Sequence, residues 1–127
     1  MKFLCIYKPS RPEGTPRSPQ ETQQEMEKMG KLIEEMTKNG SLISTEGCLP
    51  SALGARVRLA NGKFITTDGP FTEAKEIVGG MAIIQAKSKA EAIELTKNFL
   101  QVAGDGDTEI RQLYEPGMDF THHSATN

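Results

Sequence analysis

The sequence predicts a single α+β domain in which one antiparallel sheet carries both helices on the same face, the ferredoxin-like plan. The chain has 127 residues, the length of one ordinary domain. Its apolar pattern changes between strand-like and helix-like periods, giving the order strand, helix, strand, hairpin, strand, helix, strand. We assign residues 1–116 to the domain and residues 117–127 to a loosely held C-terminal tail.

The first β-α-β half begins with an apolar strand over residues 2–8. A proline-rich loop over residues 9–17 follows, because proline lacks a backbone donor and disfavours helix in the residue before it. Ser18 and Glu21 form a capping box that starts a helix, and Asn39-Gly40 ends it. A second strand is expected over residues 41–47.

The expected first helix carries an apolar stripe at three- and four-residue spacing, which predicts the face that packs on the sheet. The stripe consists of Met26, Met29, Leu32, Ile33 and Met36. Gly30 interrupts it and lowers helix stability by about 1 kcal/mol relative to alanine. We therefore interpret Gly30 as a point of close packing against the sheet.

The second half follows a hairpin. Residues 55–67 alternate apolar and polar side chains around Asn61-Gly62, the favoured two-residue type I′ turn. An apolar strand is expected over residues 77–86. Ser88 and Glu91 form the capping box of a second helix, and residues 107–116 form the last strand.

The predicted arrangement leaves one face of the sheet without helices. An apolar sheet face needs a cover, and pairing two sheets in a homodimer supplies one. A cleft between the two subunits is then the natural place for a small ligand. We therefore expect a second copy of the chain as the partner.

Composition and charge exclude several classes of function. The formal charge is −2, from 15 basic and 17 acidic residues, and no stretch forms a basic stripe typical of nucleic-acid binding. The opening apolar run is too short for a secretion signal, and no run reaches the length of a membrane span. We expect a cytoplasmic protein with no membrane partner, in which Cys5 and Cys48 are free structural residues.

Residues 66–86, TTDGPFTEAKEIVGGMAIIQA, resemble the signature of the DGPF-domain proteins within the broader YCII-related group. The N-terminal strand, the Val-Arg hairpin strand and the closing EIRQLYEPGMDF agree in position and character. The resemblance implies a dimeric α/β-barrel of ferredoxin-like subunits. In the broader group a His–Asp pair has been suspected of acid–base catalysis. Asp68 matches the acidic member, whereas the only histidines, His122 and His123, lie in the tail.

The DGPF segment has two interpretations. As a structural turn, it uses Asp68 to cap backbone N–H groups, glycine and proline to set the bend, and Phe71 as an anchor in the core. As a functional element, it places the Asp68 carboxylate at the mouth of a cleft, to accept a proton or hold a polar group. We favour the turn, because aspartate is common in turns without catalysis.

The remaining candidate site residues are charged or phenolic. Glu76 is a candidate acid–base group beside Lys75, which would hold an anionic ligand; an exposed ion-pair cluster is the alternative. Arg58 and Arg111 on strands suit carboxylates or phosphates if they face a cleft, and otherwise lie on a solvated face. Tyr7 could add a hydroxyl to the same cleft, and a buried tyrosine with its hydroxyl satisfied is the alternative. No metal-ligand spacing and no cofactor motif is present, so we expect neither metal nor cofactor.

These observations favour a homodimeric binding or accessory module that takes a small polar or anionic molecule. A first alternative is a small enzyme that uses Asp68 or Glu76 for proton transfer. It predicts one of these carboxylates in a partly dry cleft. A second alternative is a regulatory protein-interaction module, which predicts a large exposed apolar patch.

Overall fold

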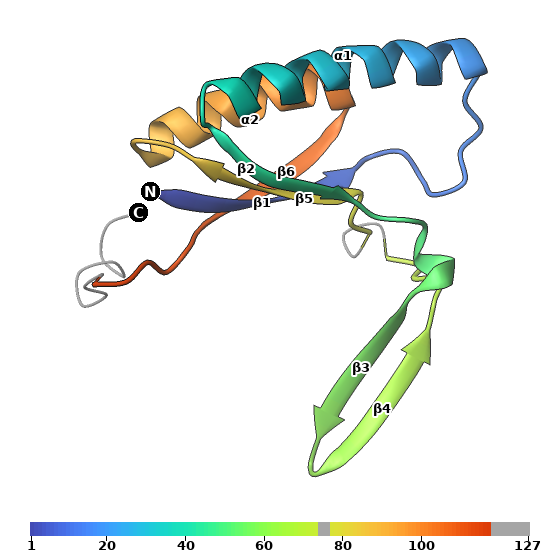
Figure 1. Ribbon diagram of the computed structural model, residues 1–127. Coiled ribbons are helices and arrows are strands. Elements are labelled where there is room, and N and C mark those ends of the chain that lie inside the picture. Colours follow the sequence, from blue (N-terminus) through green and yellow to red (C-terminus); the bar gives the residue numbers. More distant parts are fainter. Residues whose placement is uncertain (74–76, 118–127) are drawn as a thin grey trace.

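A computed structural model describes residues 1–73 and 77–117 of the chain (Figure 1). In chain order the elements are β1 (Lys2–Pro9), α1 (Pro19–Lys38), β2 (Leu42–Gly47), the short 3-10 helix η1 (Ser51–Leu53), β3 (Ala55–Ala60), β4 (Lys63–Asp68), β5 (Gly80–Gln85), α2 (Lys89–Ala103) and β6 (Gly106–Gln112). The order predicted from the sequence is confirmed.

The body of the molecule is a four-stranded antiparallel sheet in the order β2-β5-β1-β6. Both helices cover the same face of this sheet (Figure 1). This is the strand order of the ferredoxin-like plan, with β1 and β5 in the centre and one β-α-β half contributing each edge. The predicted fold is therefore confirmed.

Both helices start where the capping boxes predict. The Ser18 side chain accepts a hydrogen bond of 3.0 Å from the Glu21 N–H at the start of α1. The Ser88 side chain accepts one of 3.1 Å from the Glu91 N–H at the start of α2. These bonds satisfy N–H groups that have no partner within a helix.

The expected apolar stripe of α1 is only partly correct. Met36 is buried, but Met26 is 69% exposed, because the first part of α1 extends beyond the end of the sheet (Figure 1). Gly30 is exposed, and a Cβ at its position would meet nothing within 4 Å outside its own helix. The expectation that Gly30 marks close packing against the sheet is therefore wrong.

The two faces of the sheet differ as strand alternation requires. Phe3 and Cys5 point toward the helices, where they join the core cluster with Met36, Ile84, Ala86 and Ala92. The alternate side chains of β1 and β5 face away from the helices. They are Leu4, Ile6, Met81 and Ile83, and we call the surface that they form the open face. On it, Leu4 lies opposite Ile83 and Ile6 lies opposite Met81.

The β3–β4 hairpin forms a separate two-stranded sheet. It projects away from the body on the side of the open face (Figure 1). Its turn residues Asn61 and Gly62 have φ values of 52° and 75°, as a type I′ turn requires. We call residues 55–68 the arm.

Candidate functional site

A cavity of about 390 Å³ lies between the two helices and the sheet. Its walls are mainly apolar and include Met29, Leu32, Ile33, Leu42, Leu95 and Phe99. Protein interiors hold few voids larger than a water molecule, whereas small-molecule sites measure about 300–1,000 Å³. The space between sheet and helices is therefore large enough for a ligand.

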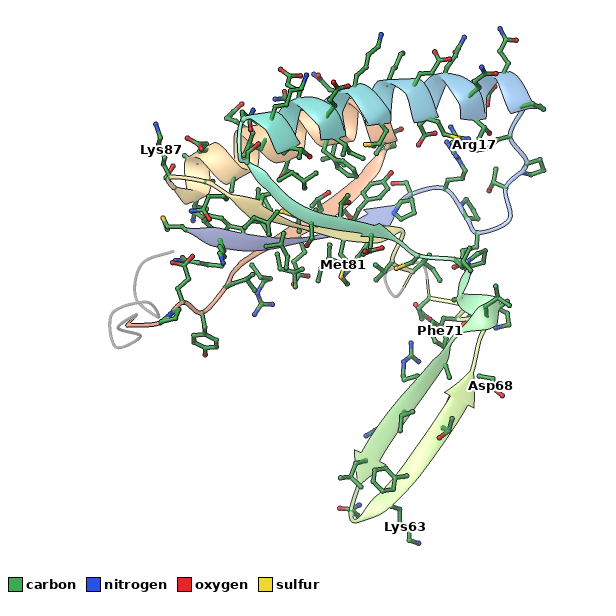
Figure 2. The ribbon with its side chains drawn as sticks, in the orientation of Figure 1. Arg17, Lys63, Asp68, Phe71, Met81 and Lys87 are labelled. Atoms are coloured by element: carbon green, nitrogen blue, oxygen red, sulfur yellow. The ribbon has the colours of Figure 1, made fainter. Side chains whose placement is uncertain are left out.

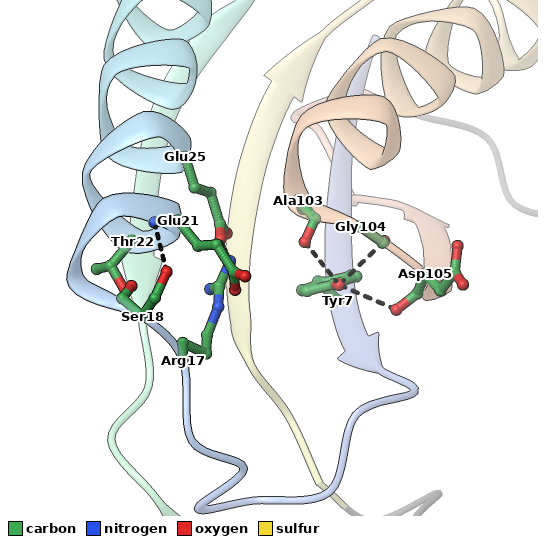
Figure 3. Close-up of polar contacts among 9 residues, drawn as sticks. All are labelled: Tyr7, Arg17, Ser18, Glu21, Thr22, Glu25, Ala103, Gly104 and Asp105. Carbon is green, nitrogen blue, oxygen red and sulfur yellow. Dashed lines mark hydrogen bonds and ion pairs between the residues drawn. The ribbon is translucent and has the colours of Figure 1, made fainter.

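Tyr7 brings a polar group to this cavity from the helix-facing side of β1. Its hydroxyl donates toward the end of α2, where the carbonyls of Ala103, Gly104 and Asp105 lie at 3.4, 3.1 and 3.3 Å (Figure 3). Its ring meets Phe99 edge-on, with 5.2 Å between the ring centroids. Burial, followed by the negative charge of Glu25, raises the pKa of Tyr7, so the phenol stays neutral.

An ion pair lies near the start of α1, on the helix side of the cavity. Arg17, the last residue of the proline-rich loop, pairs with Glu25, which lines the cavity (Figure 3). Both side chains are about three-quarters buried, with 28% and 26% exposed. The pairing compensates the Glu25 charge, so this acidic group does not stand alone at the cavity wall.

Thr108 has an unmatched polar atom at the same cavity. It lies on β6 opposite Tyr7, and its Oγ1 is buried without a hydrogen-bond partner. Leaving such a group without a partner disfavours folding by about 1–3 kcal/mol. A hydrogen-bonding group of a ligand would satisfy it.

The other hydroxyl and thiol groups at the cavity are satisfied within the chain. Thr96 donates to the Ala92 carbonyl at 2.8 Å and contacts Cys5. Burial raises the pKa of the Cys5 thiol, which therefore stays protonated and unreactive. Cys5 and Cys48 are both free, as expected, and Cys48 is exposed.

The DGPF segment forms a structural joint at the base of the arm. The Gly69 N–H donates to the Gly54 carbonyl at 3.0 Å, and the Phe71 N–H donates to Ser51 Oγ at 3.0 Å. The Glu13 carboxylate, in the proline-rich loop, accepts bonds from the Ser51 N–H and hydroxyl at 2.7 and 2.6 Å. These bonds connect the joint to the 3-10 helix and to that loop.

Phe71 and Asp68 play parts in this joint that differ from the expected ones. The Phe71 ring is half-buried outside the core cluster, and the Arg56 guanidinium lies 4.4 Å from its centroid. The Asp68 carboxylate is exposed and forms no hydrogen bond within the described part of the chain. The turn is therefore held by Ser51 and Glu13, without a cap from Asp68.

The structure does not bring the predicted site residues together. Tyr7 lines the cavity, whereas Arg58 and Asp68 are exposed on the arm. Figure 2 shows Asp68 near the base of the arm. Arg111 lies on the side of the sheet away from the helices, where it pairs with Glu109 at 3.1 Å. Lys75, Glu76 and the tail histidines fall outside the described residues.

Sequence reasoning missed two groups at the cavity, Glu25 and Thr108. Glu25 lies four residues before Met29 and therefore falls on the inward-facing stripe of α1. A charged residue on this otherwise apolar stripe is the signal that could have identified it. Thr108 alternates with Ile110 on the inward face of β6, as a partly buried polar residue would.

Residues 1–73 and 77–117 contain no cluster of three or more His, Cys, Asp or Glu residues arranged to hold a metal ion. Neither of the two long helices has the length and hydropathy needed to span a bilayer.

The sequence matches the model of the YCII-related domain over residues 1–115, nearly its whole length. The chain belongs to the YCII-related domain family. One relative is the uncharacterized protein R00369 of Rhizobium meliloti strain 1021. It is 28% identical over 103 residues, which cover 79% of this chain and 83% of the relative. The resemblance inferred from the DGPF segment is thus confirmed at the level of the family.

A solved structure similar to this YCII-related chain is 5-chloro-2-hydroxyhydroquinone dehydrochlorinase from Burkholderia phenoliruptrix AC1100, in complex with 2,5-dihydroxybenzoquinone. The identity is 15%, the alignment covers 90% of this chain and 94% of the other, and the TM-score is 0.47.

Proposed function

We propose that this protein binds a small, largely apolar molecule in the cavity between its helices and sheet, and that it does so as a homodimer. The observation that carries the proposal is the cavity of about 390 Å³ with the buried, unpartnered Thr108 Oγ1 in its wall. An apolar space of this size gains packing contacts when a molecule fills it, and the lone hydroxyl gains a hydrogen-bond partner. A bound molecule provides both interactions.

The polar groups around the cavity favour a ligand that carries a hydrogen-bond donor. Carbonyls at the end of α2 and the paired Glu25 carboxylate are acceptors, and the neutral Tyr7 hydroxyl accepts as well as donates. The lining contains the Glu25 carboxylate and, among the described residues, no lysine or arginine. A neutral molecule with a hydroxyl or amine group fits this wall better than an anion does.

The anionic ligand suggested by the sequence depended on Arg58, Arg111 and Lys75, of which Lys75 falls outside the described residues. Both arginines lie away from the cavity, one on the arm and the other among the charges beside the open face. The ligand site that we propose also lies within one chain, whereas the sequence suggested a cleft between subunits. Dimerisation therefore has a separate basis in the open face.

The homodimer is supported by the apolar centre of the open face. Leu4, Ile6 and Ile83 are half-buried within one chain, and Met81 is 43% exposed. Apolar side chains grouped on a sheet face favour a cover, and a second copy offers an identical apolar surface.

Binding in the cavity is testable with N-phenyl-1-naphthylamine, a neutral aromatic amine whose fluorescence rises in apolar surroundings. Ala82→Leu adds bulk to the cavity wall, whereas Ala90→Leu makes the same change at an exposed position of α2. We expect Ala82→Leu to raise the Kd for the probe at least about tenfold, the loss of roughly 1.4 kcal/mol, and Ala90→Leu to leave it unchanged. Equal Kd values for both variants would contradict the proposed site.

Native mass spectrometry of protein purified gently from its expression host tests the ligand directly. A dimer that carries extra mass, lost in Ala82→Leu and kept in Ala90→Leu, supports the proposal. Extra mass that is equally present in both variants places the bound molecule elsewhere and contradicts it.

A further inference from the structure

Large exposed apolar side chains gather in one segment of the chain, from the residues before η1 to the first half of β4. They are Leu49, Leu53, Val57, Leu59, Phe64 and Ile65, with exposed fractions from 51% to 76%. The arm consists of two strands paired only with each other. An isolated two-stranded hairpin is marginally stable in water, so this one needs a surface to pack on.

The arm has one apolar and one basic face. Directly paired residues share a face of an antiparallel ladder. Leu59 lies opposite Phe64, and Val57, two residues from Leu59, points to the same side. The other face carries Arg56, Arg58 and Lys63, together with Ile65, which lies opposite Arg58.

Charge favours another copy of this chain as the occupant. The arm contains three basic residues and one acidic residue, which leaves 12 basic and 16 acidic residues for the rest of the chain. A basic arm is therefore attached to an acidic body. Opposite net charges on the arm and the body guide the association of two copies. The border of the open face itself carries both signs, with Glu46 opposite Met81 on β2, and Asp107 and Glu109 beside Lys8 and Arg111.

The direction of the arm fits the same partner. It leaves the body on the side of the open face and points away from its own sheet (Figure 1). A second copy that covers the open face lies on this side, and its own arm points back in the opposite direction. Twofold symmetry then makes both contacts at once and closes the assembly.

We propose that the β3–β4 hairpin is a dimerisation arm, whose Val57, Leu59 and Phe64 face packs on the body of a second copy beside its open face. This inference rests on the dimer part of the proposed function and is independent of the ligand part. In this dimer, one symmetric interface buries both the exposed apolar face of the hairpin and the uncovered face of the sheet. The basic face of the arm remains directed to solvent and to acidic residues at the rim.

The first test compares two matched substitutions on opposite faces of the arm, Leu59→Asp and Ile65→Asp. Analytical ultracentrifugation of the full chain gives the dimer Kd. We expect Leu59→Asp to raise it at least about a hundredfold, because the buried charge occurs twice in a symmetric dimer, and Ile65→Asp to change it less than about tenfold. Unchanged amide exchange in β1 and β5 verifies that the body is folded. A wild-type monomer, or equal effects of both variants, overturns the proposal.

The second test locates the contact. Phe64 is replaced by p-benzoylphenylalanine, and 14N- and 15N-labelled chains are mixed before irradiation. The proposed dimerisation arm is supported if cross-links join differently labelled chains and reach residues 2–8, 80–85 or 106–112 of the second copy. Cross-links confined to one chain, or to added phosphatidylcholine vesicles, overturn it. Probe binding is measured on the same samples: a monomer that binds N-phenyl-1-naphthylamine refutes the arm alone, and an arm-linked dimer that does not bind it refutes the ligand site alone.

Discussion

Replacing Gly69 by alanine tests whether the DGPF segment is a structural joint. A Cβ at this position would lie 1.7 Å from the Ser51 carbonyl oxygen and 2.5 Å from its carbon. Both are backbone atoms, so either the turn or η1 must move. The movement strains two hydrogen bonds, from the Gly69 N–H to Gly54 and from the Phe71 N–H to Ser51.

The expected loss follows from these contacts. Overpacking destabilises by about 1–3 kcal/mol, and each lost hydrogen bond by about 0.5–1.5 kcal/mol. We therefore expect Gly69→Ala to reduce the stability of the segment around residues 48–73 by about 2–6 kcal/mol. Segment-resolved amide exchange measures this loss locally, and urea unfolding measures any effect on the whole domain.

Gly54→Ala is a matched control, because a Cβ there would also face the Ser51 carbonyl oxygen, at an ordinary contact distance of 3.5 Å. We expect this variant to stay within about 0.5 kcal/mol of the wild type. If the amide hydrogens of residues 48–73 exchange at the wild-type rate in both alanine variants, the joint does not constrain the arm. The structural interpretation of the DGPF segment is then refuted.

Three further changes test other parts of the structure. Gly30→Ala should stabilise the domain by about 0.5–1 kcal/mol in urea unfolding, because the site is exposed and free of tertiary contacts; destabilisation would show hidden packing. Asp68→Asn should change stability by less than about 0.5 kcal/mol and leave probe binding intact, since the carboxylate is exposed; loss of binding would restore its functional role. Tyr7→Phe should destabilise by about 0.5–1.5 kcal/mol at neutral pH through its lost hydroxyl bonds. The pKa values of Tyr7 and Cys5 are higher in the folded than in the unfolded chain. The stability that these groups contribute is therefore complete below their unfolded pKa values. It is lost as the pH rises above about 9, the ordinary pKa of Cys. Unfolding curves between pH 7 and 10.5 should therefore decline less steeply in Tyr7→Phe than in the wild type, and equal slopes would contradict this cause.

Local signals predicted the fold well because they act within a few residues. The capping boxes at Ser18 and Ser88 and the Asn61-Gly62 turn each depend on neighbours in sequence. Met26 and Gly30 were misjudged for the opposite reason. Their burial depends on where the sheet ends beneath α1, and helical spacing does not contain that information.

The candidate site was harder to predict because it depends on long-range packing. Tyr7 was identified, but its cavity partners Glu25 and Thr108 come from another helix and another strand. Arg58, Asp68 and Arg111 were grouped by charge and by an assumed cleft, and the fold places them on separate surfaces. Whether a hydroxyl such as that of Thr108 lacks a partner emerges only when strand register and helix position are both fixed.

The DGPF tetrapeptide, residues 68–71, lies outside the cavity, whereas the later part of the family signature, residues 79–82, lines it. The tetrapeptide holds the base of the arm to η1 through Ser51, and Glu13 extends these contacts into the proline-rich loop. That loop ends at Arg17, whose partner Glu25 lines the cavity. The residues that fix the direction of the arm are therefore contiguous with those that border the proposed ligand site. The DGPF tetrapeptide therefore reports how the arm is connected to the body, and the choice of ligand has to be found in the side chains that line the cavity.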